Sequence, residues 1–168
     1  MIWPMTCLNH YKNQPAMKYR RLTNEELKKL ESDFLKFLEN NEISLEQWNH
    51  ILETDAVLAE EWIATYSDNV LQKSLENVGY LEDRRPKEFK LYRCAEDRIF
   101  LIALNANEQN ALDFTNMEGV NQLSPDDYSV FKSDKPYIPS REEEIYQLMQ
   151  KGCVKTNGRL FDILACMP

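Results

Sequence analysis

Basic side chains gather in one short stretch of an otherwise acidic chain. Residues 84–98 carry six of them, namely Arg84, Arg85, Lys87, Lys90, Arg93 and Arg98. Guanidinium and ammonium groups that converge on one face bind carboxylates or phosphates through charge-assisted hydrogen bonds. Our candidate anion-binding residues are therefore Arg84, Arg85, Lys87, Arg93 and Arg98. The competing interpretation, which we favour, is that these groups pair with carboxylates of the same chain and protect a strand edge from aggregation.

Residues for nucleophilic or metal chemistry are few and scattered. Only His10 and His50 could act as imidazole bases, and neither stands at a metal-ligand spacing from another histidine or a cysteine. The four cysteines lie far apart, at Cys7, Cys94, Cys153 and Cys166. The four glycines are isolated, so no phosphate-binding loop can be written. We therefore assign no catalytic residue and no metal ligand, and expect no cofactor.

Three aromatic residues lie on the apolar faces of consecutive expected helices. Trp48, Trp62 and Tyr66 are candidates for a partner-binding surface, because large aromatic groups often anchor protein interfaces. Packing inside the core is the commoner role for such side chains. An exposed ring beside other apolar groups would favour the partner surface.

The charge distribution excludes several classes of function. The net charge is −8, and residues 22–83 hold fifteen acidic against four basic side chains. Such a surface repels phosphate backbones, so we expect no direct nucleic-acid binding. The longest apolar run, residues 99–104, is far shorter than the ~20 residues of a membrane-spanning helix, so we expect no membrane association. Unpaired, scattered cysteines favour a cytoplasmic protein.

Helical signals dominate residues 22–78. Thr23 and Glu26 have the spacing of a capping box, and apolar residues then recur at three- and four-residue steps to residue 38. Ser44 and Gln47 repeat the box before a second, shorter helix, so the pair indicates a helical hairpin. A third helix is expected from about Asp55, with a bend or restart at residues 67–69, where polar side chains compete for backbone hydrogen bonds.

The pattern changes to strands at residue 79. Residues 79–105 indicate an antiparallel meander with strands near 80–84, 89–94 and 98–104, and the last of these is apolar throughout, as in a central strand. Residues 106–139 are polar and expected to be irregular. Residues 140–166 indicate a helix with a C-cap glycine, followed by a short hairpin turning at Asn157 and Gly158.

Together these elements predict an α+β fold: a three-helix segment, including the helical hairpin, packed on a small antiparallel sheet, with a C-terminal helix and a short hairpin. We expect one domain over residues 17–168. Residues 1–16 show no periodicity and are expected to be a disordered extension or an artefact of gene-start choice, with Met17 as the true start.

Two segments carry a resemblance to known proteins. They are MKYRRLT at residues 17–23 and RRPKEFKLYRC at residues 84–94. In overall pattern the chain from Met17 to about its end resembles a family of short, uncharacterised cytosolic bacterial proteins, classed as a domain of unknown function. The resemblance implies no active residue, substrate or cofactor.

Two functions remain open. We expect a non-enzymatic interaction or adaptor protein of the cytoplasm, because the helical half is acidic, its ionisable candidates are isolated and cofactor motifs are missing. Its partner would be another protein or a second copy in a homodimer, in which the apolar strand at 99–104 is covered. The alternative is a small enzyme or ligand-binding protein that holds an anionic ligand at the basic hairpin.

Overall fold

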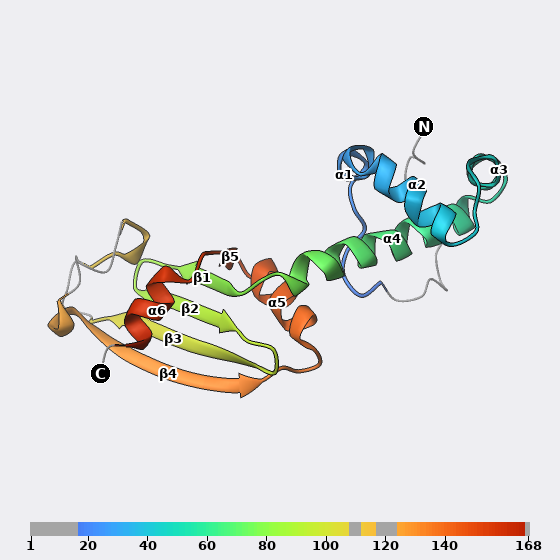
Figure 1. Cartoon of the computed structure of the whole chain (residues 1–168). Helices are drawn as coiled ribbons and strands as arrows, with labels where there is room; N and C mark the ends of the chain where they lie inside the picture. The colour runs from blue at the N-terminus through green and yellow to red at the C-terminus, as the bar shows by residue number, and fades with distance from the viewer. Residues whose placement is uncertain (1–16, 108–111, 117–123, 167–168) are drawn as a thin grey trace. The chain divides into compact units, whose positions relative to one another are not determined.

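The chain forms two compact units with their boundary between Lys73 and Ser74. The sequence, in contrast, predicts a single domain over residues 17–168. The computed structural model describes residues 17–107, 112–116 and 124–166. Helices come first and a five-stranded antiparallel sheet follows, which confirms the α+β class (Figure 1). Residues 1–16, expected to be an extension, lie outside the described part. Packing of the helical segment on the sheet stays a prediction.

The first unit contains α1 (Asn24–Lys29), α2 (Glu31–Asn40), α3 (Leu45–Thr54) and most of α4 (Ala56–Glu76). Both capping boxes form as predicted, with Thr23 accepting from the Glu26 amide and Ser44 from the Gln47 amide. The expected first helix is divided at Leu30, whose backbone leaves helical geometry at φ −103° and ψ 14°. None of the described helices is long and apolar enough to cross a bilayer.

Aromatic packing holds these helices together. Phe34 of α2 is fully buried and meets the ring of Trp48 at 5.1 Å and that of Tyr66 at 5.0 Å, both edge to face. Each such pair contributes roughly 0.5–1.5 kcal/mol beyond the burial of its apolar area. The apolar spacing read from the sequence therefore becomes one core shared by α2, α3 and α4.

The segment before α1 is tied to the middle of α4. The Tyr19 amide donates to Asp68 Oδ1 at 3.0 Å, and Arg21 Nε lies 2.8 Å from Glu60 Oε2. The buried Ser67 hydroxyl donates to the Ile63 carbonyl and accepts from the Leu22 amide, at 2.6 and 3.0 Å. These polar side chains bind without interrupting the helix, so the restart expected at residues 67–69 is wrong.

The second unit is built on the sheet. Its strands are β1 (Tyr80–Arg84), β2 (Glu88–Cys94), β3 (Arg98–Ala106), β4 (Tyr128–Pro136) and β5 (Val154–Lys155), in the order β4-β3-β2-β1-β5. The first three are the predicted meander, and β3 is central as its apolar sequence indicates. Two helices complete the unit, α5 (Arg141–Gln150) and α6 (Arg159–Ala165).

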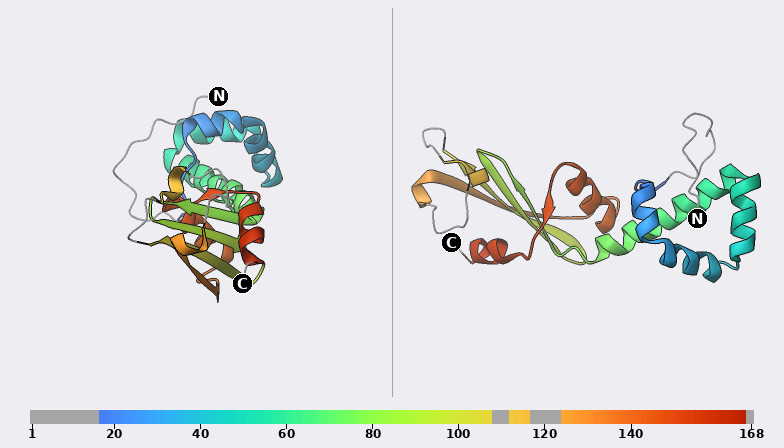
Figure 2. Two further views of the ribbon diagram at one scale, coloured as in Figure 1. Left: turned by 90° about the vertical axis from the view of Figure 1, so that its left-hand side faces the viewer. Right: turned by 90° about the horizontal axis from the view of Figure 1, so that it is seen from above.

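Alternating side chains give the sheet two different faces. On one face Phe89, Leu91 and Leu104 are buried against Phe161 and Leu164 of α6. The other face carries Lys90, Tyr92, Ile99 and Leu101 and meets α5. The right-hand view of Figure 2 shows the two helices on opposite sides of the strands. The sheet is thus a middle layer with one helix on each face.

Strand β4 corrects the prediction that residues 106–139 are irregular. It pairs with β3 along its whole length, from Tyr128 opposite Ala106 to Pro136 opposite Arg98. It is an end strand whose side chains are almost all exposed, so polar residues occupy both of its faces. The apolar alternation that identifies a half-buried strand is therefore missing from its sequence.

The C-terminal hairpin is also corrected. Only Val154 and Lys155 are extended, and residues 159–165 form α6 instead of a second hairpin strand. Gly158 adopts a left-handed φ of +78°, as a turn would require, but here it is the N-cap of the helix. The Asn157 side chain accepts from the Arg159 amide at 3.1 Å and helps to begin the helix.

Arg141 joins three segments of the second unit. Its guanidinium donates to the carbonyls of Leu75 and Val78, at the end of α4 and just beyond it, at 3.2 and 2.7 Å. It also donates to the carbonyls of Cys94 and Ala95 beside the β2–β3 turn, at 3.2 and 3.0 Å. The positive charge therefore satisfies carbonyls that the end of a helix leaves unpaired.

Candidate functional site

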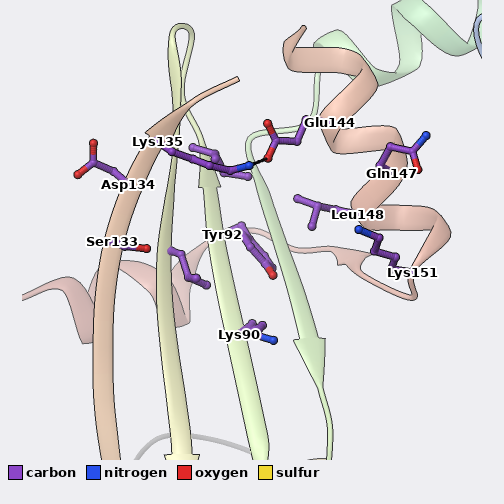
Figure 3. Close-up of a pocket in the computed structure, with 11 residues that line it drawn as sticks. Lys90, Tyr92, Ser133, Asp134, Lys135, Glu144, Gln147, Leu148 and Lys151 are labelled. Carbon is purple, nitrogen blue, oxygen red and sulfur yellow. Dashed lines mark ion pairs between the residues drawn. The ribbon is translucent and has the colours of Figure 1, made fainter. Parts of the chain in front are cut away.

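A groove opens between α5 and the face of the sheet opposite α6 (Figure 3). Its volume is about 410 Å³, which lies within the ~300–1,000 Å³ range of small-molecule sites. Strands β2, β3 and β4 supply one side and α5 with its C-cap residue the other. The lining residues are Lys90, Tyr92, Ile99, Leu101, Ser133, Asp134, Lys135, Glu144, Gln147, Leu148 and Lys151.

The apolar part of the groove is formed by the sheet and by one residue of α5. Ile99 and Leu101 come from β3, Tyr92 from β2, and Leu148 points from α5 toward the sheet in Figure 3. Burial raises the pKa of the Tyr92 phenol above its ordinary value, so Tyr92 is a neutral hydrogen-bond donor at physiological pH. An apolar group of a ligand can therefore be buried here with one polar contact available.

Local sequence signals fix the position of α5. The Ser140 side chain accepts from the Glu143 amide and begins the helix. At the other end Gly152 has a φ of +106°, and the Cys153 amide donates to the Leu148 carbonyl at 3.1 Å. This Schellman motif stops the helix immediately after Lys151. Leu148 and Lys151 are thereby held beside the groove.

Three lysines surround the groove, each in a different electrostatic setting. Lys135 Nζ lies 2.6 Å from Glu144 Oε1, the ion pair dashed in Figure 3. Lys90 Nζ lies 2.8 Å from Glu88 Oε2. Within the described part of the chain, the Lys151 ammonium forms no ion pair. An incoming anion could therefore contact Lys151 without displacing a carboxylate, whereas it would share Lys90 with Glu88.

Two of the predicted anion-binding arginines pair with carboxylates two positions earlier in the chain. Arg84 Nε lies 3.0 Å from Glu82 Oε1, and its guanidinium stands 4.5 Å from the ring centre of Phe89. Arg85 Nη2 lies 2.9 Å from Asp83 Oδ2. These contacts match the internal pairing that the sequence analysis favours.

The remaining predicted residues of the anion site are also engaged by the chain. Lys87 Nζ donates to the Leu112 carbonyl at 3.2 Å, and Arg93 stands 5.7 Å from the ring centre of Phe100. Arg98 pairs with Asp97 and Asp134. By their register Arg84, Arg93 and Arg98 point to the α6 side of the sheet, away from the groove. The structure does not bring the five candidates together at one site.

The predicted partner-surface residues lie in the helical core. Trp48 and Tyr66 are buried, at 0% and 4% exposure, and Trp62 is half-buried with its ring 6.0 Å from that of Phe37. The proposal that Trp48 and Tyr66 form a partner surface is therefore corrected to core packing. The large apolar side chains that are exposed lie elsewhere, and two of them, Val130 and Phe131, are neighbours on β4.

Two of the cysteines are buried in the second unit. Burial raises the pKa of both Cys94 and Cys153 to about 11, so their thiols are protonated at neutral pH and poor nucleophiles. The described residues that line the groove include no histidine and no cysteine.

Comparison with known proteins identifies the family. A family of unknown function, DUF6495, matches residues 17–167. The chain belongs to this family. The match confirms the resemblance to a domain of unknown function read from residues 17–23 and 84–94. No curated protein and no solved structure matches the chain.

Proposed function

We propose that this member of the family is a non-enzymatic binding protein whose groove holds an apolar group carrying a negative charge. The observation that carries the proposal is the convergence of Lys90, Lys135 and Lys151 around a groove of about 410 Å³ with an apolar sheet side. Apolar burial would supply most of the affinity, and the ammonium groups would select an anion. The scattered cysteines support a cytoplasmic location.

The anion site in this proposal differs from the one predicted at the arginines of the hairpin. Arg84 and Arg85 already have carboxylates as partners, so a ligand would have to displace Glu82 and Asp83. Lys151 needs no such exchange within the described part of the chain. Its ammonium is therefore the strongest contribution to anion selection.

Thermal unfolding of the full chain in the presence of three probes tests this function. Octanoate carries both features, octanamide lacks the charge, and acetate lacks the apolar body. We expect octanoate alone to raise the Tm in a saturable, salt-sensitive manner, because a ligand that binds only the native state stabilises it. Equal shifts with octanoate and octanamide would contradict the charge selection.

Matched variants locate the site. The double variant Lys90→Gln, Lys151→Gln keeps similar side-chain volumes and removes two positive charges from the groove. Lys28→Gln removes the same charge from an exposed position on α1. We expect the double variant to lose most of the octanoate shift and Lys28→Gln to retain it. The groove is the wrong site if both variants respond as the wild type does.

A second candidate function, protein interaction, is favoured by the exposed edge of β4. Val130 and Phe131 are 47% and 55% exposed on this end strand. Edge strands present backbone groups that pair readily with a strand of another chain. This supports the protein-interaction function expected from the sequence. The contact surface would lie on the sheet instead of on the acidic helices. Binding of a partner strand would be detected as protection of β4 amides from hydrogen exchange, which should stay unchanged if the surface lies elsewhere.

A further inference from the structure

The outer edge of β4 is long and regular. The strand extends over nine residues, and its inner edge is fully paired with β3. No other strand in the described part of the chain pairs with its outer edge. Figure 1 shows β4 as the last strand on that side of the sheet. Every residue from Ser129 to Pro136 is exposed, including the apolar Val130 and Phe131.

The register shows which backbone groups face outward. The Ala106 amide of β3 donates to the Lys87 carbonyl beside β2, and the next amide, that of Asn107, donates to the Asp127 carbonyl beside β4, each at 2.9 Å. Odd-numbered positions of β3 therefore take the hydrogen-bonded places opposite β4. Hydrogen-bonded pairs alternate with non-hydrogen-bonded pairs along an antiparallel ladder. The odd-numbered residues of β4 therefore bond to β3, whereas the amides and carbonyls of Val130, Lys132 and Asp134 are directed outward.

We propose that the partner of this edge is a second copy of the same chain, paired β4 to β4 antiparallel about a two-fold axis at Phe131. The inference rests on the protein-interaction candidate and names its partner. A two-fold axis requires a self-complementary edge. In this register Phe131 faces Phe131 of the second copy in a non-hydrogen-bonded pair, where side chains are closest.

The charges along the edge fit this register. Lys135 of each copy faces Asp127 of the other, and the Lys135 ammonium, which lies 2.6 Å from Glu144, would be shared between the two carboxylates. Lys132 faces Val130 of the second copy and covers it with its aliphatic stem. Phe131 is thus covered by its counterpart on one face of the sheet and Val130 by Lys132 on the other, and no like charges stand opposite each other.

Two registers with the axis closer to the C-terminal end of β4 are less favourable. An axis at Lys132 places the two Lys132 ammonium groups opposite each other, which is destabilising. An axis at Ser133 pairs Val130 with Pro136 of the second copy, and proline has no amide to donate. That register loses a hydrogen bond at each end. The axis at Phe131 uses outward amides and carbonyls that are all present.

This pairing also extends the groove. Residues that face each other across paired strands lie on the same face of the sheet. Both grooves would therefore open on one side of a continuous ten-stranded sheet, five strands from each copy. Ser133, which lines the groove, would face Ser129 of the second copy. The second copy thus continues the β4 side of each groove.

Light scattering on the eluting full chain gives the first test. We expect about twice the chain mass of 19.9 kDa for the wild type and the single-chain mass for Phe131→Asp, because two carboxylates would then meet at the axis. Val57→Asp is the matched control, since Val57 is 50% exposed on α4 and should not affect the mass. A monomeric wild type at about 100 μM, well above the ~μM Kd of a weak specific complex, overturns the proposal. A dimer that survives Phe131→Asp overturns it as well.

A second variant, Val130→Pro, controls for a folding defect caused by Phe131→Asp. Val130→Pro removes an outward amide and leaves the ladder to β3 intact, so it should also give the single-chain mass with an unchanged circular dichroism spectrum. Monomeric Phe131→Asp can then be tested with octanoate. A retained octanoate shift would show that ligand binding in the groove and pairing of β4 are separate properties.

Disulfide trapping tests the register. In a chain carrying Cys7→Ser and Cys166→Ser, Phe131→Cys should form a dimer on oxidation, because the Cα atoms of a non-hydrogen-bonded pair are about 4.5 Å apart. Ser133→Cys should cross-link only when mixed with Ser129→Cys. Cross-linking of Ser133→Cys with itself, without that of Phe131→Cys, places the axis at Ser133 and contradicts the register.

Discussion

Replacement of Arg141 should destabilise the second unit more than its place at the start of a short helix suggests. The side chain is 17% exposed, and its guanidinium bonds to carbonyls of the α4 end and of the β2–β3 turn. Arg141→Ala removes all of these bonds together. The carbonyl oxygens could then accept hydrogen bonds only from water that reaches them.

The expected magnitude follows from the two shortest of these contacts. Val78 O and Ala95 O lie 2.7 and 3.0 Å from the guanidinium nitrogens. A hydrogen bond to a charged group contributes roughly 1.5–3 kcal/mol. Because the site is near the surface and water can replace part of each bond, we expect Arg141→Ala to lower the free energy of unfolding by about 3 kcal/mol. The Tm should fall by roughly 10 °C.

Urea unfolding followed by circular dichroism measures this loss. Arg159→Ala is the matched control, because Arg159 is exposed on α6 and should change stability by at most about 0.5 kcal/mol. Arg141→Lys should recover less than half of the loss, because a single ammonium group cannot donate to both the α4 end and the β2–β3 turn as the guanidinium does. Hydrogen exchange should increase at the Ala95 amide. A loss below about 1 kcal/mol for Arg141→Ala, or full recovery with lysine, would refute the argument.

Two further predictions concern a glycine and a carboxylate. A Cβ on Gly158, where φ is +78°, would lie 2.5 Å from the Tyr80 ring, so Gly158→Ala should cost about 2 kcal/mol in urea unfolding. Gly79→Ala meets nothing within 4 Å and should be almost neutral. Hydrogen bonds from Arg20 and from the Thr23 amide lower the pKa of Glu26 to about 2, so its stabilisation is present above the unfolded pKa near 4.5 and is lost as the pH falls through about 2. The stability difference between wild type and Glu26→Gln should shrink between about pH 6 and about pH 2, and a constant difference would contradict this reasoning.

Helices with local start and stop signals could be predicted from the sequence. Thr23, Ser44 and Ser140 each accept from the amide three residues later, and Gly152 adopts the positive φ of a helix stop. These contacts involve residues close in sequence, so the spacing of residue types shows them directly. The central strand was predictable for a related reason, because a strand buried on both faces is apolar at consecutive positions.

Elements whose character depends on distant contacts could not be predicted. The sequence of β4 is polar because the strand lies at an edge, and only its pairing with β3 makes it a strand. In α6, Leu160, Phe161 and Leu164 fit a helical stripe, but Asn157 and Gly158 before them are equally typical of a hairpin turn. Packing of Phe161 and Leu164 on the sheet decides between the two.

The groove depends both on contacts between residues close in sequence and on contacts between distant segments. Lys90 and Tyr92 belong to a strand that the sequence predicts, and Lys151 ends a predicted helix. Lys135 joins them only because β4 pairs with β3. The predicted basic stretch contained Lys90, yet alternation along β2 and β3 directs Arg93 and Arg98 to the opposite face. Charge clustering in sequence therefore did not identify the lysines that gather in space.

The segment before α1 has a consequence for folding on the ribosome. Its contacts join Tyr19, Arg21 and Leu22 to residues of α4 that lie 49, 39 and 45 positions later in the chain. At a synthesis rate of roughly 5–20 residues per second, the segment leaves the ribosome seconds before its binding site exists. A nascent chain that stops short of Asp68 thus has no side chain to receive the Tyr19 amide. The earliest part of the described chain to be made is among the last parts of its unit that can dock.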